Sequence, residues 1–323
     1  MAATGMERPF SWLLVAALAS DALDGLLARA FSWTSRLGSL LDSLADAMLM
    51  LVAAYGVWVF HYYVFEDYGI LIWGVFHEHV YESRWTLAPG LDLVLHADTL
   101  SVLFVTLSTV LWLVTTVYAI GYLENAPHRS RFFGFFSLCV SATVGLALAG
   151  NMFTFVIFYE LLTLATYPLV AHRGTPEATR GTRIYLTYTL GGGMLLLIGT
   201  VWLHVLAGPA AFVEGGTLHR LPEQYHPQLK MIFLLLIAGL GVKAALVPVH
   251  GWLPQAMVAP APVSALLHAV AVVKAGAFGI VRVVYDVYGV NFTDQLGLLG
   301  ILGIAAAVTI IYGSLRALYQ DNL

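Results

Sequence analysis

Four ionisable residues lie in stretches of sequence that are otherwise apolar. Glu160 falls in FTFVIFYELLTLATYPLV and Lys243 in MIFLLLIAGLGVKAALVPVHGWLP, while His268 and Lys274 share APAPVSALLHAVAVVKAGAFGIVR. An ionised side chain is costly in hydrocarbon, so those within membrane segments usually face partners or water and mark ion or proton routes. We therefore interpret these residues as a proton path.

The chemistry requires that the carboxylate and the amine act on each other. Burial and a nearby carboxylate shift the pKa of a lysine in opposite directions, so moving Glu160 would switch whether Lys243 holds a proton. Pro248 follows Lys243 by five residues and should break its helix beside the charge, freeing carbonyls that can hold water. His250 lies on nearly the same helical face, as a relay station or as a cap of the following loop.

These residues must be positioned by membrane helices. The chain has 323 residues, of which 59% are hydrophobic and only 11% charged. Many apolar runs reach the length of about 20 residues that crosses a bilayer. The sequence therefore predicts an all-α, polytopic helical membrane protein with broken helices in its transport core. About nine helices are expected, near residues 10–28, 42–64, 97–121, 131–149, 152–171, 183–206, 231–250, 262–284 and 296–318.

Charge placement predicts the orientation of these helices. Arginines cluster in segments 122–131 and 172–183, which the positive-inside rule places on the cytoplasmic side. Segments 77–96 and 207–229 then become external loops, and we expect Arg282 to reach the outer interface along its flexible stem. An integral protein of a bacterial inner membrane fits this pattern.

Other features narrow the function. Cys139 is the only cysteine, so the chain cannot supply a thiolate set for an iron–sulfur cluster. The net charge is -4 with no polybasic run, which indicates no nucleic-acid partner. The expected partners are the lipid bilayer and other membrane subunits, with no cofactor in the transport core. Gly191, Gly192 and Gly193 predict close helix packing rather than a phosphate cradle.

Residues 21–46 carry a second motif, DALDGLLARAFSWTSRLGSLLDSLAD. Its aspartates are spaced to share helix faces, so that two helix ends can gather four carboxylates. Such hard oxygen ligands suit Mg²⁺ or Mn²⁺ beside a pyrophosphate. The alternative is a relic motif whose carboxylates are solvated at the membrane surface.

The order D-x2-D-G-x2-A-R-x8-G-x3-D-x3-D resembles the signature of CDP-alcohol phosphatidyltransferases. By this resemblance Asp21, Asp24 and Asp42 would bind metal and Asp46 would act as base or ligand. The remaining defined positions would approach the nucleotide and its phosphates: Gly25, Ala28 and Arg29.

From about Trp85 onward the chain resembles the proton-translocating, antiporter-like subunits of respiratory complex I, Mrp antiporters and membrane-bound hydrogenases. The resemblance rests on ADTLSVLF, FVIFYELLTLATYPLV, GVKAALVPVHGWLPQAMVAPAPVSALLHA, VKAGAFGIVR and YGSLRALYQDN. It implies that Glu160 and Lys243 are the essential membrane pair, and that His268 and Lys274 are relay residues. Such subunits continue past this point, so the domain is expected to be incomplete at its C-terminus.

Three domains follow from these resemblances: partial phosphatidyltransferase-like helices at 1–65, an interfacial segment and external loop at 66–96, and an antiporter-like domain at 97–323. The favoured hypothesis is a proton-translocating membrane subunit that works alongside a redox machine or exchanges protons for a monovalent cation. The alternatives are a lipid-headgroup transferase and a scaffold subunit without transport.

Overall fold

The structure is a computed structural model that describes residues 82–319, apart from 89, 125 and 268–270. The predicted helices 10–28 and 42–64, with the motif at 21–46, therefore lie outside the described residues. Contacts divide the chain into two compact units, residues 80–309 and residues 1–79 with 310–323. Of the second unit, the structure describes only the end of the last helix.

A β-hairpin lies within the predicted external loop 77–96. Strands β1 (Glu82–Ala88) and β2 (Leu91–His96) pair antiparallel, with Trp85 opposite Leu93. Gly90 has a φ of +82° in the turn, a conformation that glycine adopts without a steric penalty. The amide of Val94 donates to the Thr154 hydroxyl at 2.8 Å, which joins the hairpin to the helical bundle.

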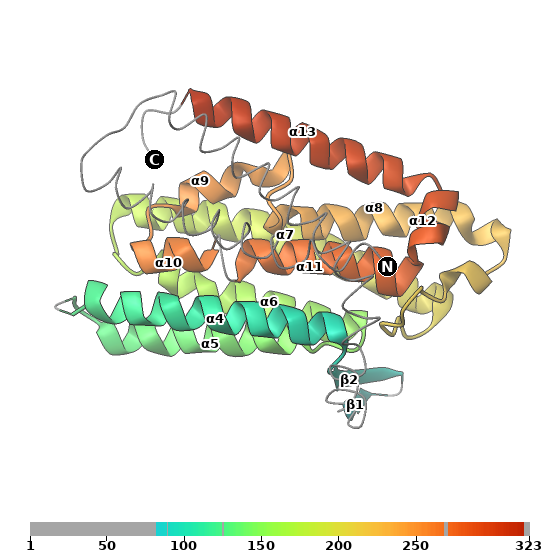
Figure 1. Cartoon of the computed structure of the whole chain (residues 1–323), viewed down its shortest axis with the longest axis horizontal. Coiled ribbons are helices and arrows are strands. Elements are labelled where there is room, and N and C mark those ends of the chain that lie inside the picture. The colour runs from blue at the N-terminus through green and yellow to red at the C-terminus, as the bar shows by residue number, and fades with distance from the viewer. Residues whose placement is uncertain (1–81, 89, 125, 268–270, 320–323) are drawn as a thin grey trace, which may run out of the picture. The chain divides into compact units, whose positions relative to one another are not determined.

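The rest of the described chain is a bundle of helices (Figure 1). Six are long and apolar enough to cross a membrane, which confirms the predicted polytopic helical membrane protein. The helices are α4 (Thr99–Tyr122), α5 (Arg129–Ala147), α6 (Met152–Val170), α7 (Pro176–Ala207), α8 (His226–Lys243), α9 (Trp252–Ala256), α10 (Ala261–Ala265), α11 (Val272–Arg282), α12 (Val290–Gln295) and α13 (Leu298–Leu318). Short 3-10 helices occupy η1 (Leu218–Arg220), η2 (Glu223–Tyr225) and η3 (Val249–Gly251), and the π-helix η5 (Val283–Tyr288) follows α11 directly.

Polar caps fix where three of the long helices begin. The side chains of Asp98, Asn151 and Thr175 accept hydrogen bonds from the amide three residues later, at 2.7, 2.7 and 3.1 Å. Such caps satisfy amides that the first helical turn leaves without partners. Because Thr175 is followed by Pro176 at the first helical position, α7 begins earlier than the predicted residue 183.

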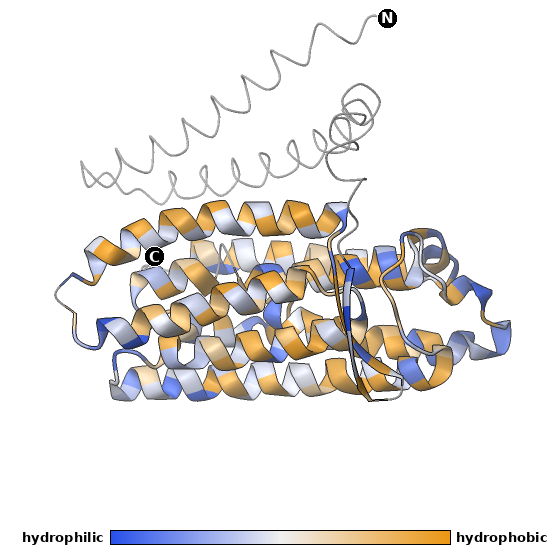
Figure 2. Ribbon diagram, turned by 90° about the horizontal axis from the view of Figure 1, so that it is seen from below, coloured by the Kyte–Doolittle hydropathy of each residue, from blue (hydrophilic) through white to orange (hydrophobic). Residues whose placement is uncertain are grey.

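Hydroxyl groups inside the apolar helices bond to their own backbone. Threonine side chains donate to the carbonyl four residues earlier, at 2.6–3.3 Å, in α4, α5, α6, α7 and α13. This leaves few polar groups to be satisfied between helices. Hydrophilic residues gather mainly at the helix ends and connections, as Figure 2 shows.

The two arginine segments that are predicted to be cytoplasmic meet at one end of the bundle. Arg131 donates to the carbonyl of His172 at 3.4 Å, and Arg173 donates to the hydroxyl of Tyr122 at 3.4 Å. The ends of α4 and α6 therefore adjoin the start of α5. The predicted orientation depends on these two arginine segments lying at the same end of the bundle.

Helix α8 breaks beside Lys243, as predicted for the transport core. The amide of Ala245 donates to the carbonyl of Val242 at 3.1 Å, and that of Leu246 donates to Gly241 at 2.9 Å. These two bonds form a Schellman motif around Ala245, which has a φ of 56°. The helix thus ends before Pro248 is reached, and the proline only prevents it from resuming at once.

The predicted helix 262–284 does not appear as one regular helix in the described residues. Helix α10 ends at Ala265 and α11 begins at Val272, and the amide of Ala271 donates to the carbonyl of Leu266 at 3.0 Å. Helix α11 then packs closely on the end of α8, because a Cβ atom at Gly276 would collide with the backbone amide of Ala244. The glycines of α11 permit this contact.

We expect Ala245→Gly to stabilise the protein by about 1 kcal/mol, because glycine reaches the left-handed conformation without the penalty that a Cβ brings. Ala244→Gly is the matched control: its φ of -67° is helical, so the added freedom should destabilise by up to about 1 kcal/mol. Thermal unfolding of the detergent-solubilised protein measures the midpoints, which should rise from Ala244→Gly through wild type to Ala245→Gly. A lower midpoint for Ala245→Gly would contradict the assigned helix end.

Candidate functional site

Lys243 is the last residue of α8 and is completely buried. Its Nζ donates a hydrogen bond to the backbone carbonyl of Tyr159 and lies 3.4 Å from the centroid of the Tyr159 ring. A cation at a helix C-terminus also faces the negative end of the helix dipole. The broken end of α8 and the middle of α6 therefore hold the amine between them.

Glu160 follows Tyr159 on α6 and is half-buried. Its carboxylate is near enough to Lys243 for the two charges to interact, but among the described residues no direct ion pair joins them. Its Oε1 is buried and accepts no hydrogen bond from any described residue. The structure therefore places the two side chains within electrostatic reach of each other, without a direct ion pair.

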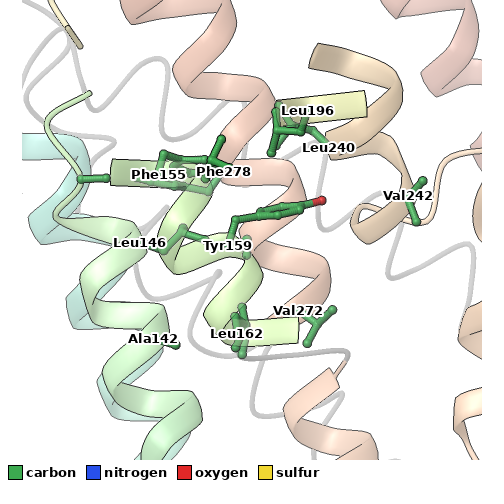
Figure 3. Close-up of a cluster of buried hydrophobic side chains, with 14 of the residues drawn as sticks. Ala142, Leu146, Phe155, Tyr159, Leu162, Leu196, Leu240, Val242, Val272 and Phe278 are labelled. Carbon is green, nitrogen blue, oxygen red and sulfur yellow. The ribbon is translucent and has the colours of Figure 1, made fainter. Parts of the chain in front are cut away.

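Tyr159 is the residue that sequence reasoning missed at this site. Its hydroxyl donates to the carbonyl of Gly239 at 3.0 Å, so one side chain links α6 to α8. Figure 3 shows this ring extending from α6 toward the helix that carries Leu240 and Val242. The indole of Trp252 donates to the carbonyl of Val242 at 2.6 Å and satisfies a carbonyl at the broken helix end. Tyr159 thus contacts the amine, and Trp252 bonds to the helix end that carries it.

The predicted relay residues lie on the segments around this break. His250 is half-buried in η3, after Pro248, and Lys274 is half-buried in the first turn of α11. Lys274 is two residues from Gly276, which packs against the end of α8. His268 lies outside the described residues, as do the N-terminal positions Asp21, Asp24, Gly25, Ala28, Arg29, Asp42 and Asp46.

Arg282 corrects a prediction. It does not reach the outer interface: its side chain is 1% exposed. The guanidinium donates to Asp98 at 2.5 and 2.8 Å, to Asp286 at 2.7 Å and to the Ser101 hydroxyl at 2.6 Å. The signal in the sequence was Asp286, four residues onward on the same helical face. We call these four residues the outer clasp.

The outer clasp fixes the charge of Asp98, the residue that caps α4. Burial alone would raise the pKa of its carboxyl, but the hydrogen bonds and charge of Arg282, with the bonds from Ser101, outweigh burial and hold this pKa below its ordinary value. The carboxylate therefore stays ionised and ties the start of α4 to the end of α11.

The fold and site define a class: an integral membrane protein with a buried charge at a broken helix. Comparison with family models places residues 149–323 in the family described as "NADH:quinone oxidoreductase/Mrp antiporter, TM". This match covers more than half of the chain, and the chain belongs to that family. Residues 4–120 match the CDP-alcohol phosphatidyltransferase family.

Curated relatives agree with this assignment. The chain is 30% identical over 255 residues to a protein of Rhizobium meliloti named as part of a probable K⁺/H⁺ antiporter, covering 77% of this chain and 24% of the relative. It is 32% identical over 250 residues to an NADH-quinone oxidoreductase protein of Desulforudis audaxviator, covering 75% and 48%. The chain therefore spans a quarter to a half of the length of these relatives.

Solved structures share the fold. The Mrp complex of a Dietzia species matches with a TM-score of 0.60 and 24% identity, over 89% of this chain and 29% of that chain. An archaeal membrane-bound sulfane sulfur reductase matches with a TM-score of 0.56 and 19% identity, over 86% and 53%.

We expect Asp98→Asn to lower the free energy of unfolding by about 2 kcal/mol, because Arg282 loses one of its two carboxylates while asparagine still caps α4. Asp92→Asn is the control, since Asp92 faces the exposed Arg84 at 3.6 Å and should cost less than about 1 kcal/mol. Thermal unfolding of the purified protein gives both differences.

The stability difference between wild type and Asp98→Asn should depend on pH. A carboxyl whose pKa is lowered by folding contributes stability above its unfolded pKa, near 3.9, and this contribution is lost as the pH falls through the folded value. The gap between wild type and Asp98→Asn should therefore close below about pH 4. A gap that persists in acid would contradict the clasp.

Proposed function

We propose that the chain carries protons through the membrane as one member of a multi-subunit complex, either NADH:quinone oxidoreductase-like or an Mrp-type cation/proton antiporter. One observation carries the proposal: a fully buried lysine ends a broken helix, beside a glutamate that it does not touch. Charged groups in such positions mark ion and proton pathways in membrane proteins.

The pair suits proton exchange because each group depends on the other. Burial favours the neutral form of an amine, whereas a nearby carboxylate favours the charged form. Lys243 keeps a fixed acceptor in the Tyr159 carbonyl, while Oε1 of Glu160 has no hydrogen bond from the described residues. A shift of the carboxylate toward or away from the amine would therefore load or release a proton.

The relay proposed beyond this pair runs in two directions. His250 would pass protons between Lys243 and the cytoplasmic loop, and Lys274 with His268 would continue the path along the broken α10–α11 segment. Two features support this assignment: His250 and Lys274 are half-buried, and α11 contacts the end of α8 through Gly276. Water is expected to bridge the remaining distances.

The proposed partners are other membrane subunits of a bacterial inner-membrane complex. Support comes from the relatives, one of which is named for a K⁺/H⁺ antiporter and another for NADH-quinone oxidoreductase. Genes beside this one distinguish the two settings. Hydrogenase or NADH-dehydrogenase genes would indicate a redox pump, and small Mrp-like genes an antiporter.

We expect Lys243→Ala to abolish proton uptake by liposomes that contain the complex, with assembly unchanged. Lys230→Ala is the matched control, because Lys230 is exposed near the other end of the same helix and should transport at the wild-type rate. A pH-sensitive dye reports uptake, and the amount of assembled complex is measured in parallel. Normal uptake by Lys243→Ala would leave only a scaffold role.

A second function is proposed for the N-terminal region. The family match over residues 4–120 and the complete signature at 21–46 favour a CDP-alcohol phosphatidyltransferase activity in phospholipid synthesis. Asp21, Asp24 and Asp42 would bind Mg²⁺ or Mn²⁺, and Asp46 would serve as base or ligand. Gly25, Ala28 and Arg29 would approach the nucleotide and its phosphates.

Purified protein incubated with CDP-diacylglycerol, Mn²⁺ and an alcohol acceptor should then release CMP. Asp46→Asn should remove this release, while Lys243→Ala should leave it unchanged, since the two residues belong to separate proposals. Chromatography of the nucleotides measures the product. No CMP above the level of Asp46→Asn would show that the motif is inactive and that its carboxylates have another role.

A further inference from the structure

Three consecutive glycines of α7 have three different surroundings. A Cβ atom added at Gly191 would meet open space. One added at Gly192 would collide with Val242 and with the backbone carbonyl of Gly239, both on α8. One added at Gly193 would occupy the volume that the carboxylate of Glu160 fills. Close packing alone, as the sequence predicts for all three, accounts only for Gly192.

The contact with Gly193 is specific to the carboxylate. Of the atoms nearest to the added Cβ, all three belong to the end of the Glu160 side chain: Oε1, Cδ and Oε2. Oε1 is the atom that is buried without a hydrogen bond from the described residues. The carboxylate therefore rests against the backbone of α7, in a space that exists because residue 193 has no side chain.

Gly192 makes the corresponding contact with the helix that carries Lys243. Gly192 places α7 directly against Val242, the residue before Lys243. Adjacent residues of one helix thus contact both sides of the proposed proton-exchanging pair: Gly192 touches the helix that carries the amine, and Gly193 touches the carboxylate. The local path of α7 sets how far apart the two groups stand.

We infer that Gly193 is a positioning residue for Glu160, which keeps the carboxylate at the separation from Lys243 that proton exchange requires. The inference rests on the proposed function of this pair. A methyl group at residue 193 would push the carboxylate out of its space without altering any ionisable group. Displacements of about 1 Å at a reacting group can reduce a rate by about a hundredfold.

The test measures proton transport by the complex in liposomes, normalised to the amount of assembled complex. Gly193→Ala should reduce the initial rate at least about tenfold, a conservative part of the loss that misplacement causes. Gly191→Ala is the matched control and should stay within about twofold of wild type, because both changes replace glycine by alanine in the same helix.

The decisive experiment shortens the side chain of residue 160, so that the space taken by a methyl group at residue 193 becomes available again. Glu160→Asp shortens the carboxylate by one methylene, so the double variant Gly193→Ala with Glu160→Asp should transport faster than the product of the two single effects predicts. A purely structural role of Gly193 would give independent effects. The thermal unfolding midpoints of wild type, the two single variants and the double variant are measured as well. They show whether the shorter side chain fits beside the added methyl group even if Glu160→Asp alone transports slowly.

The outcomes separate this inference from the function on which it rests. Normal transport by Gly193→Ala, equal losses in the Gly191 and Gly193 variants, or additive effects in both cycles would each overturn the positioning role. Normal transport by Glu160→Ala would overturn the proposed function itself. If Gly193→Ala does not assemble, recovery of assembly by Glu160→Asp supports the inference, and continued failure of the double variant counts against it.

Discussion

The structure depends on satisfying a buried ammonium group where a helix ends. Lys243 has no solvent to solvate it, so its charge needs a carbonyl, an aromatic face and the negative end of a helix dipole. The Schellman turn at Ala245 supplies the helix end. Tyr159 supplies both the carbonyl and the ring, and Trp252 satisfies a carbonyl at the end of the same helix. The end of α8 therefore places the amine where the carbonyl, the ring and the helix dipole can stabilise its charge.

Among the described residues, the buried cations Lys243 and Arg282 have different partners. Arg282 is held by two carboxylates and a hydroxyl, so its charge is fixed and it serves to join α4 to α11. Lys243 receives a carbonyl and a ring but, among the described residues, no direct carboxylate. A group whose charge is fully compensated has no reason to change protonation, whereas one whose partner stands apart responds to small movements of that partner. Lys243 and Glu160 are therefore less completely paired than Arg282 and its two carboxylates, which is the difference on which the proposed proton exchange depends.

Sequence reasoning located this site because its signals are local. A charge inside an apolar run and a proline shortly after it predict a buried group beside a helix break, and the structure contains that break at Lys243. The burial of Arg282 was harder to predict: Asp286 is a local signal, but the other carboxylate that binds it, Asp98, lies 184 residues away. The sequence also did not predict that α10 and α11 are separate helices, because between Val263 and Arg282 the segment has no proline to mark a helix end.

Glycine contacts differ between the two members of the pair. Helix α8 is gripped from two sides, because Gly192 of α7 and Gly276 of α11 both bring backbone against it around Lys243. Backbone contacts of this kind leave no space for the helix end to shift without losing packing. The carboxylate of Glu160, by contrast, rests against Gly193 without a hydrogen bond from the described residues to its Oε1. Backbone packing therefore holds the helix end that carries the amine, whereas the carboxylate lies in the space that Gly193 leaves open.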